Sequence, residues 1–442
     1  MKNLRYIVLV FAFSLFVLPS VQAQDFSRLS ERTIMGTARY VGMGGAMTAI
    51  GGDASAAHDN PAGLGLYRRS ETMLTTDVAI DHAIQKGTVV PRRTQWMLPQ
   101  ASVVVSLPTY DVSGIQFHNI MFSYRRLNSY ARRMEAVGTD GASLGALLNT
   151  PSVPMDIPFC SDRKNVSNHL SLNEGGYVNE FAFMYAMNIS DQWYAGVGLE
   201  IQSYLLQSDA TYYETFNTFN AAGKPFDIQN ETSLVFRGAS CDLSLGMIYR
   251  PTGWLRLGLS FQTPTVGHVH TYTRGTFRAM TDSLRYSYAP DLAYTDRGFH
   301  MPLRTSASVA FQFGAYGMVG LQYDYAHANF QNDIHTLRAG LEVIPVLGMY
   351  INAGYVYEST FKEPRITPMV ADFSRQDTYF IQPRSTQYVS GAIGYRGAYT
   401  MVQVAYQYRW QKINFYAHEA ADPYLINADT HRIVITLGWH RN

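Results

Sequence analysis

Short segments of alternating apolar and polar residues recur along most of the chain after residue 70. In 337–343, Leu, Ala or Val occupies every odd position, and Arg, Gly or Glu occupies every even one. A period of two puts the apolar side chains on one face of a strand. Several apolar faces end in Tyr or Trp, as in 402–410, while the opposite faces carry charged side chains that a sandwich core would exclude. The pattern predicts an all-β fold, an antiparallel transmembrane β-barrel with aromatic girdles and a wet lumen.

Fourteen segments fit this pattern, an even number, as a closed single-chain barrel requires. One of them, 254–280, contains Pro264, and we interpret it as a single long strand with a bulge. The predicted strands are 71–82, 99–107, 115–130, 177–189, 193–215, 232–250, 254–280, 302–313, 317–326, 334–344, 348–358, 386–396, 399–415 and 430–440.

The connections between these segments differ in length. Gly314–Tyr316 and Ile344–Gly348 are expected to be short periplasmic turns. Four long polar stretches are expected to be extracellular loops, and the first of them includes an Ala/Leu-rich piece, 142–148, with the composition of a short helix. These stretches are 131–176, 216–231, 281–301 and 359–385.

Residues 1–23 have the features of a cleaved signal peptide. Lys2 and Arg5 precede an apolar run of about a dozen residues, and Val21–Ala23 matches the small-x-small rule for cleavage. The run is too short to span a bilayer as a helix, and no later apolar stretch approaches 18 residues. The mature chain is therefore expected to start at Gln24 and to reach the bacterial outer membrane.

Charge and cysteine content narrow the classes further. The 35 basic and 34 acidic residues nearly cancel, which gives no electrostatic case for nucleic-acid binding. The only cysteines are Cys160 and Cys241, which suits an oxidising compartment without a disulfide framework. Cys241 lies in a strand pattern and is expected to pack as a small apolar residue, although a bridge between the two stays open.

Residues 24–70 do not fit the strand pattern and are rich in Gly and Ala. This composition suits tight turns and close backbone approach in a crowded interior. Because a barrel of 14 strands encloses more room than its side chains fill, we expect this segment to plug the lumen, with the barrel domain at 71–442. The residues expected to shape this plug are Gly42, Gly44, Gly45, Gly51, Gly52, Asp53, Asn60, Pro61 and Ala62.

Three runs in this segment resemble the hatch of the FadL/TodX-type transporters: Arg39–Ala46, Asp53-Ala54 and Asn60–Leu64. The segments 337–342 and 352–355 are also similar to paired strands late in that family's barrel. The family comprises 14-stranded outer-membrane barrels that take up long-chain fatty acids or aromatic hydrocarbons. The resemblance implies that extracellular loops collect an apolar ligand, which then passes to pockets lined by barrel and hatch. A shift of the hatch would release it through a lateral opening in the wall.

We expect specific roles for several residues of the hatch and of the lumen. Asp53 and Asn60 are expected to fix the hatch by hydrogen bonds, and Pro61 is expected to set its turn. Four charged residues are expected to face the lumen. Arg338 or Arg409 is expected to pair with Glu342 or Asp324, and ordinary solvation of these charges is favoured over binding of a ligand carboxylate. These lumenal charges are Asp324, Arg338, Glu342 and Arg409.

The C-terminus departs from the family pattern. Barrels of this kind usually end on Phe, whereas this chain runs on through Trp439-His440-Arg441-Asn442. We expect Trp439 to supply the terminal aromatic.

Two alternatives belong to other functional classes. An enzyme would need a positioned nucleophile and base, but no G-x-S-x-G motif occurs. The 12 His residues are interpreted as having no paired spacing, and His418-Glu419 lacks the second His of a zinc-protease helix, so neither a metal nor a cofactor is expected. A protein-interaction barrel, such as relatives that act in type IX secretion, remains open because the long loops would suit a protein partner.

The predicted strand register implies different effects on stability at two neighbouring positions. Leu341→Lys should destabilise the barrel by about 2–4 kcal/mol if Leu341 faces lipid near mid-membrane. Gly340→Lys should cost much less if Gly340 faces a roomy lumen.

Overall fold

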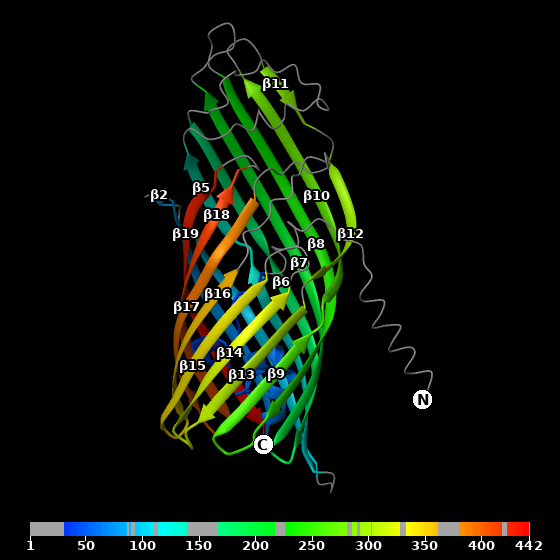
Figure 1. Cartoon of the computed structure of the whole chain (residues 1–442), viewed down its shortest axis with the longest axis vertical. Coiled ribbons are helices and arrows are strands. Elements are labelled where there is room, and N and C mark those ends of the chain that lie inside the picture. The colour runs from blue at the N-terminus through cyan, green and yellow to red at the C-terminus, as the bar shows by residue number, and fades with distance from the viewer. Residues whose placement is uncertain are drawn as a thin grey trace, which may run out of the picture.

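The computed structural model shows a closed, antiparallel β-barrel whose strands are tilted relative to the long axis of the molecule (Figure 1). β19 pairs with β1 from Ser70–Arg441 to Ile84–Asn427 and so closes the sheet. The structure describes residues 31–85, 88–89, 93–109, 114–138, 167–216, 226–280, 285–289, 292–301, 303–327, 333–360, 380–417 and 422–441.

The described elements are three short helices followed by strands. The helices are α3 (Ala38–Gly42), α4 (Ala54–Asp59) and the 3-10 helix η1 (Pro61–Leu66). The strands are β1 (Ser70–Gln85), β2 (Thr88–Val89), β3 (Arg93–Pro108), β4 (Ile115–Ser129), β5 (Arg132–Gly138), β6 (Ser167–Ile189), β7 (Trp193–Phe216), β8 (Phe226–Tyr249), β9 (Leu255–Gln262), β10 (Thr265–Met280), β11 (Arg285–Tyr288), β12 (Ala293–Met301), β13 (Leu303–Gln312), β14 (Gly317–His327), β15 (Ile334–Val346), β16 (Met349–Thr360), β17 (Phe380–Arg396), β18 (Thr400–Tyr416) and β19 (Tyr424–Arg441).

These strands build the fourteen wall strands that the sequence predicts. β2 and β11 are short hairpin extensions of β1 and β10, and β5, β10 and β13 continue β4, β9 and β12. The bulge near Pro264 is confirmed by the pairing with β8. Between the pairs Ser244–Gln262 and Cys241–Val266, β8 advances three residues while its partner advances four. One extra residue on one strand is the definition of a bulge.

The expected loops contain more strand than the sequence predicts. The stretch 281–301 contains β12, which pairs with β10 from Thr265–Met301 to Thr273–Ala293. The stretch 131–176 contains β5 and the start of β6, while β8 and β17 begin inside 216–231 and 359–385. These extensions are polar on their outer faces, so the sequence criterion of an apolar lipid face does not find them. The piece 142–148 and Cys160 lie outside the described residues, as do the predicted signal peptide and its predicted cleavage site.

The alternation of faces is confirmed by burial. On β15, Leu337 and Leu341 point outward and are 56% and 42% exposed, whereas Thr336, Gly340 and Glu342 point inward and are buried. Bulky aromatic residues are exposed near both ends of the apolar band, for example Trp254 and Tyr316 near the short turns and Trp96 near the opposite end. This distribution is typical of a barrel that faces a bilayer. Cys241 also faces outward on β8 and is a free thiol.

The lipid-face assignment yields a first prediction. Leu341→Lys is expected to lower the free energy of unfolding by about 2–4 kcal/mol, because it places a charge on the apolar outer band. The matched control is Leu347→Lys, in the turn between β15 and β16, where the side chain is 95% exposed. Denaturant unfolding in lipid vesicles measures both variants. Equal losses at the two positions would contradict the outward register.

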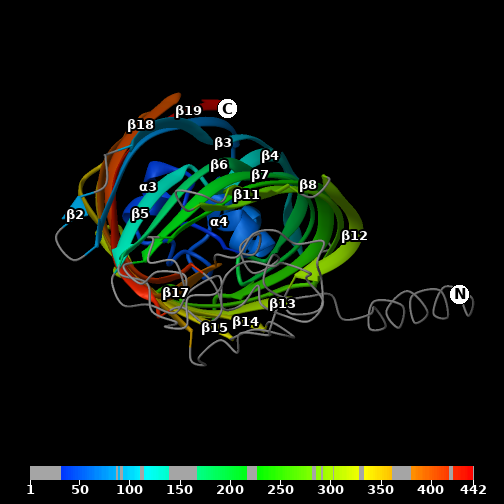
Figure 2. The ribbon, with the colours of Figure 1, turned by 90° about the horizontal axis from the view of Figure 1, so that it is seen from above.

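The N-terminal segment lies inside the barrel. Figure 2 shows α3 and α4 enclosed by the ring of strands. α3 packs on β16 to β19, and η1 packs on β4 and on β6 to β8. Residues 35–50 are buried apart from a half-buried Arg39. Among the described residues, no helix is long and apolar enough to cross a membrane.

Candidate functional site

Each helix of the N-terminal segment begins at a polar capping residue. Thr37 caps α3 and accepts from the Tyr40 amide, and Asp53 caps α4 and accepts from the amides of Ser55 and Ala56. The two caps also meet, since the Thr37 hydroxyl lies 2.9 Å and 2.8 Å from the two Asp53 carboxylate oxygens. Caps of this kind satisfy helix amides that would otherwise be buried without a partner. Asp53 therefore joins the starts of α3 and α4.

Asn60 connects the segment to the wall. Its side-chain oxygen accepts from the Ala62 amide at 3.1 Å and caps η1, in which Pro61 occupies the first turn. Its Nδ2 donates to the carbonyl of Thr48 at 3.0 Å and to that of Met247 on β8 at 3.3 Å. One amide thus ties two parts of the segment to one wall strand.

The glycines of the segment allow turns and close contacts. Gly45 has φ +71°, and a Cβ there would lie 2.7 Å from Nη1 of Arg338. Gly51 has φ +62° and would meet the Cα of Gly63 at 2.8 Å. Gly44 and Gly52 also have positive φ, and Gly42 lies in α3 against Ala392. Larger residues would therefore separate the segment from itself or from the wall.

Small residues on the wall match this close approach. A Cβ at Gly340 would lie 2.6 Å from the Met43 carbonyl oxygen, and one at Gly258 would lie 2.9 Å from the Cα of Ala49. The expectation that Gly340 faces a roomy lumen is therefore wrong, because the main chain of the N-terminal segment occupies that space. One feature of the sequence could have indicated this contact: glycine recurs at inward-facing positions of the alternating strands. The wall glycines in such contact are Gly196, Gly246, Gly258, Gly320, Gly340 and Gly354.

The four expected lumenal charges all lie on the inner side of the wall. Only some of their partners are the expected ones. Arg338 pairs with Asp324 at 2.7 Å, as expected, and also with Asp59 of α4 at 3.1 Å. Glu342 pairs instead with Arg39 of α3 at 2.6 Å and 2.8 Å. Arg409 donates to the Thr430 hydroxyl at 2.9 Å. Two of the four thus hold the N-terminal segment to the wall.

A buried polar network holds α4 against β4 and β6. The His58 ring lies with Nδ1 2.9 Å from Glu180 and Nε2 2.9 Å from the Ser123 hydroxyl. A neutral ring protonated at Nδ1 satisfies both contacts. Arg125 reaches Glu180 at 2.8 Å and Asp59 at 3.6 Å. The sequence carries no local signal for these contacts, because the alternation shows which polar side chains face inward but not which of them meet.

Burial and charge set the protonation of the segment's own groups. Burial lowers the pKa of His58, and Arg125 lowers it further against the opposing effect of Glu180. Burial alone would raise the pKa of Asp59, but Arg338 and Arg125 hold it below its ordinary value. The segment is thus seated with a neutral imidazole and an ionised carboxylate.

His58 makes the seating of α4 sensitive to acid. Because the folded-state pKa is lowered, the stabilisation is complete above the unfolded value of about 6.5 and is lost as the pH falls through the folded value. We expect protease cleavage within residues 31–67 to accelerate at pH 5 to 6 relative to pH 8. Asp59 titrates only under more acidic conditions. The control is His58→Gln, which should flatten the dependence on pH, and an unchanged profile in this variant would contradict the role of His58.

An apolar cluster lies inside the barrel on the side of the N-terminal segment that faces the long connections. Its members are buried on the inward side of the wall from β4 to β12, where a water-filled pore would carry polar groups. We call it the lumenal apolar cluster, and it consists of Leu127, Tyr130, Val178, Tyr204, Leu206, Leu234, Phe236, Val269, Phe299 and Met301.

A cavity adjoins this cluster, with Leu127 lining both. Tyr40 and Asp59 of the N-terminal segment also line it, together with wall arginines that include Arg304 and Arg338. The cavity therefore combines an apolar side with a charged side.

The wall has a seam beside this cavity. β3 and β4 pair only from Gln100–Arg125 to Pro108–Phe117, and beyond Arg125 the register of β4 with β6 shifts. Along the unpaired stretch the Thr33 amide donates to the Leu127 carbonyl at 2.9 Å. Met35 packs there on Ala79 and Met97. The start of the N-terminal segment thus lies along this β3–β4 seam.

Comparison with known proteins gives matches only at the level of structure. No protein-family model matches the chain, and no curated protein sequence matches it. The solved structure of a Pseudomonas aeruginosa FadL homologue is 13% identical, with TM-score 0.55, over 92% of this chain and 98% of that chain. The monoaromatic hydrocarbon channel CymD and the Pseudomonas putida toluene transporter TodX are each 12% identical, with the same TM-score and the same coverage. The chain therefore has the fold of the FadL/TodX-type barrels.

Proposed function

We propose that this protein is an outer-membrane channel for the uptake of hydrophobic small molecules, with the N-terminal segment as its hatch. The observation that carries the proposal is the lumenal apolar cluster. Its ten apolar or aromatic side chains are at most 7% exposed and pack on one another, so they keep water out of this part of the lumen. An apolar solute that inserts between them stays in apolar contact. The similar structures named for toluene and monoaromatic hydrocarbons support the same class of ligand.

The geometry supports a route in three steps. An apolar ligand enters from the side of the long connections and binds the lumenal apolar cluster. It then reaches the cavity that Leu127 and Asp59 line. A shift of the hatch at Thr33–Met35 would free the β3–β4 seam, where β3 and β4 make no further pairs. The ligand leaves there, and the wide lumen stays closed to water-soluble compounds.

A long-chain fatty acid fits this route as the ligand. Its tail matches the apolar cluster, and its carboxylate would meet the arginines around the cavity, including Arg304 and Arg338. Arginine is suited to planar recognition of a carboxylate. Oleate is therefore expected to be preferred over oleyl alcohol, which has the same tail without the charge.

Uptake of labelled oleate tests the proposal in cells that lack another fatty-acid channel. Phe236→Asp puts a charge into the lumenal apolar cluster and is expected to reduce uptake at least about tenfold, since burying an unpaired carboxylate costs several kcal/mol. Tyr213→Asp is the matched control, because Tyr213 faces outward on β7 and is 43% exposed. Mass spectrometry of small molecules co-purified with the barrel gives a second readout. Unchanged uptake in Phe236→Asp, or a protein partner in place of any apolar ligand, would contradict the proposal.

A further inference from the structure

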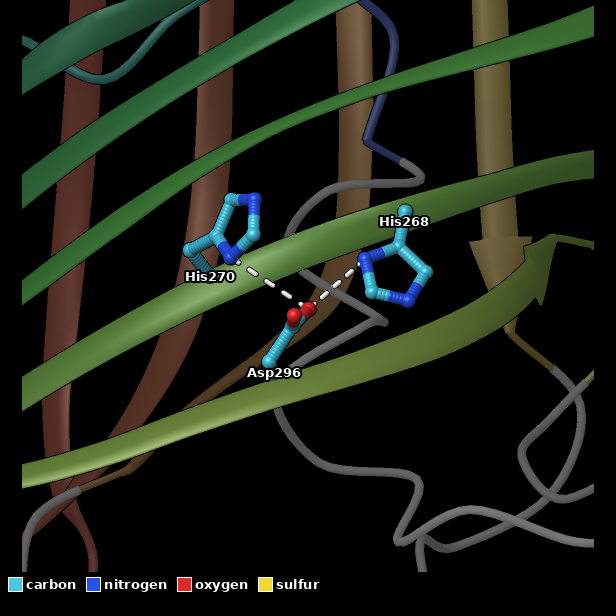
Figure 3. A group of neighbouring side chains, drawn as sticks. All are labelled: His268, His270 and Asp296. Atoms are coloured by element: carbon cyan, nitrogen blue, oxygen red, sulfur yellow. Dashed lines mark ion pairs between the residues drawn. The ribbon is translucent and has the colours of Figure 1, made fainter.

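A cluster of possible metal ligands lies on the outer face of the barrel, away from the lumen and the hatch. His268 and His270 belong to β10, and Asp296 belongs to the neighbouring β12 (Figure 3). A spacing of two residues does not match a zinc-binding helix. On a strand it places both side chains on the same face.

The pairing of the two strands brings the carboxylate to the imidazoles. His270 lies directly opposite Asp296, and His268 lies opposite Gly298. Nδ1 of His268 is 2.7 Å and Nδ1 of His270 is 3.3 Å from the same oxygen, Oδ1 of Asp296. Figure 3 shows the two rings turned toward this oxygen from both sides. One ligand atom from each of the three residues lies within 4.8 Å of the others.

The surroundings leave space for an ion and its water. A Cβ at Gly298 would meet no atom closer than 3.8 Å, so the surface beside His268 is open. The Tyr294 hydroxyl lies 3.0 Å from Nδ1 of His270 and adds an oxygen at the edge of the cluster. Two imidazoles and one carboxylate with open positions are the donors that zinc and other divalent transition ions prefer.

The cluster is accessible from water. The side chains of His268, His270 and Asp296 are 58%, 45% and 42% exposed. They lie beyond the apolar part of β8, where Leu243 and Leu245 face outward, because His270 pairs with the exposed Arg237 further along that strand. The three side chains are therefore on the polar extension of the wall.

We propose that His268, His270 and Asp296 form a surface site for a divalent transition-metal ion, with Zn²⁺ as the probe ion. Two exposed imidazoles that are free to face water converge instead on one oxygen of the exposed Asp296 carboxylate. An ion would take the place of the proton on Nδ1 of each ring, and each neutral imidazole would then carry its proton on Nε2. The ion would also balance the charge of the carboxylate. It would also cross-link β10 and β12, which continue the wall beyond the apolar band. This inference does not depend on the proposed transport function.

Isothermal titration of Zn²⁺ into tag-free full-length barrel in detergent tests the site. One saturable ion per chain is expected, with binding at least about tenfold weaker in His268→Asn and in Asp296→Asn. The matched control is His431→Asn, which removes an exposed imidazole bonded to Tyr406. This control should bind like the unaltered protein. All of these substitutions are on the outer surface, and heat-modified mobility on gels checks that each barrel is folded.

The visible absorption of bound Co²⁺ provides a second readout, because its intensity depends on coordination number and on the ligands. A spectrum lost in Asp296→Asn and retained in His431→Asn would support the proposal. Absence of saturable Zn²⁺ binding would overturn it. Equal affinity in Asp296→Asn and the unaltered protein would overturn it as well.

Discussion

Arg125→Met is expected to destabilise the folded barrel by about 3–5 kcal/mol, the usual cost of removing one partner from a buried ion pair. Arg125 is 5% exposed and contacts both Glu180 of β6 and Asp59 of α4. Methionine fills a similar volume without the charge, so Glu180 would remain buried beside His58 with no cation. Thermal unfolding in detergent measures the loss, and limited proteolysis shows whether α4 is released first.

Two further variants separate the charge effect from general damage. Arg133→Met removes an arginine that is half exposed and pairs with Glu135 at 3.0 Å, and exposed pairs of this kind contribute about 0–1 kcal/mol. Arg125→Met combined with Glu180→Gln should recover part of the stability, because the uncompensated carboxylate is gone. A similar loss in Arg125→Met and Arg133→Met would show that the buried network does not hold the hatch.

Gly340→Ala is expected to loosen the hatch and make the barrel leak. The added Cβ would lie 2.6 Å from the Met43 carbonyl oxygen, so one of the two must move. β15 is held by hydrogen bonds to β14 and β16 on either side, and the hatch is therefore the part that gives. Overpacking of this size costs about 1–3 kcal/mol. Planar-bilayer conductance and entry of a hydrophilic antibiotic measure the leak.

The control for this variant is Gly391→Ala on β17. There the nearest atom to the added Cβ is the Asn352 carbonyl oxygen at 3.4 Å, an ordinary contact. The control should remain closed, while Gly340→Ala should conduct. A Gly340→Ala variant that is as tight and as stable as the unaltered protein would contradict the close packing of the hatch on this glycine.

The prediction of fourteen strands succeeded because a lipid-facing strand must repeat apolar side chains with a period of two. Leu337 and Leu341 are therefore recognised from their neighbours alone. The bulge at Pro264 was accessible for a similar reason, since proline cannot donate to a ladder. β5 and β12 were missed because they extend beyond the bilayer, where water on the outer face removes the requirement for apolar residues.

Contacts between distant segments could not be predicted from the alternation of residues or from proline positions. Glu342 was expected to pair with another wall residue but pairs with Arg39, 303 positions away. Gly340 was assigned to an open lumen because alternation tells which face is inward but not what fills the interior. The sequence interpretation of no paired His spacing missed His268 and His270, which lie two residues apart on β10. Only the pairing of β10 with β12 shows that Asp296 lies opposite His270.

The local residue pattern was enough to predict the barrel, its number of strands, its lipid-facing side and an N-terminal segment of a different kind. These are consequences of periodicity and backbone preference, which act over a few neighbouring residues. The contacts of that segment with the wall glycines, the charges that hold it and the position of the β3–β4 seam are visible only in the folded molecule. Those features depend on steric fit and ion pairing between segments that are tens to hundreds of residues apart. Such segments come into contact only when the barrel folds and closes.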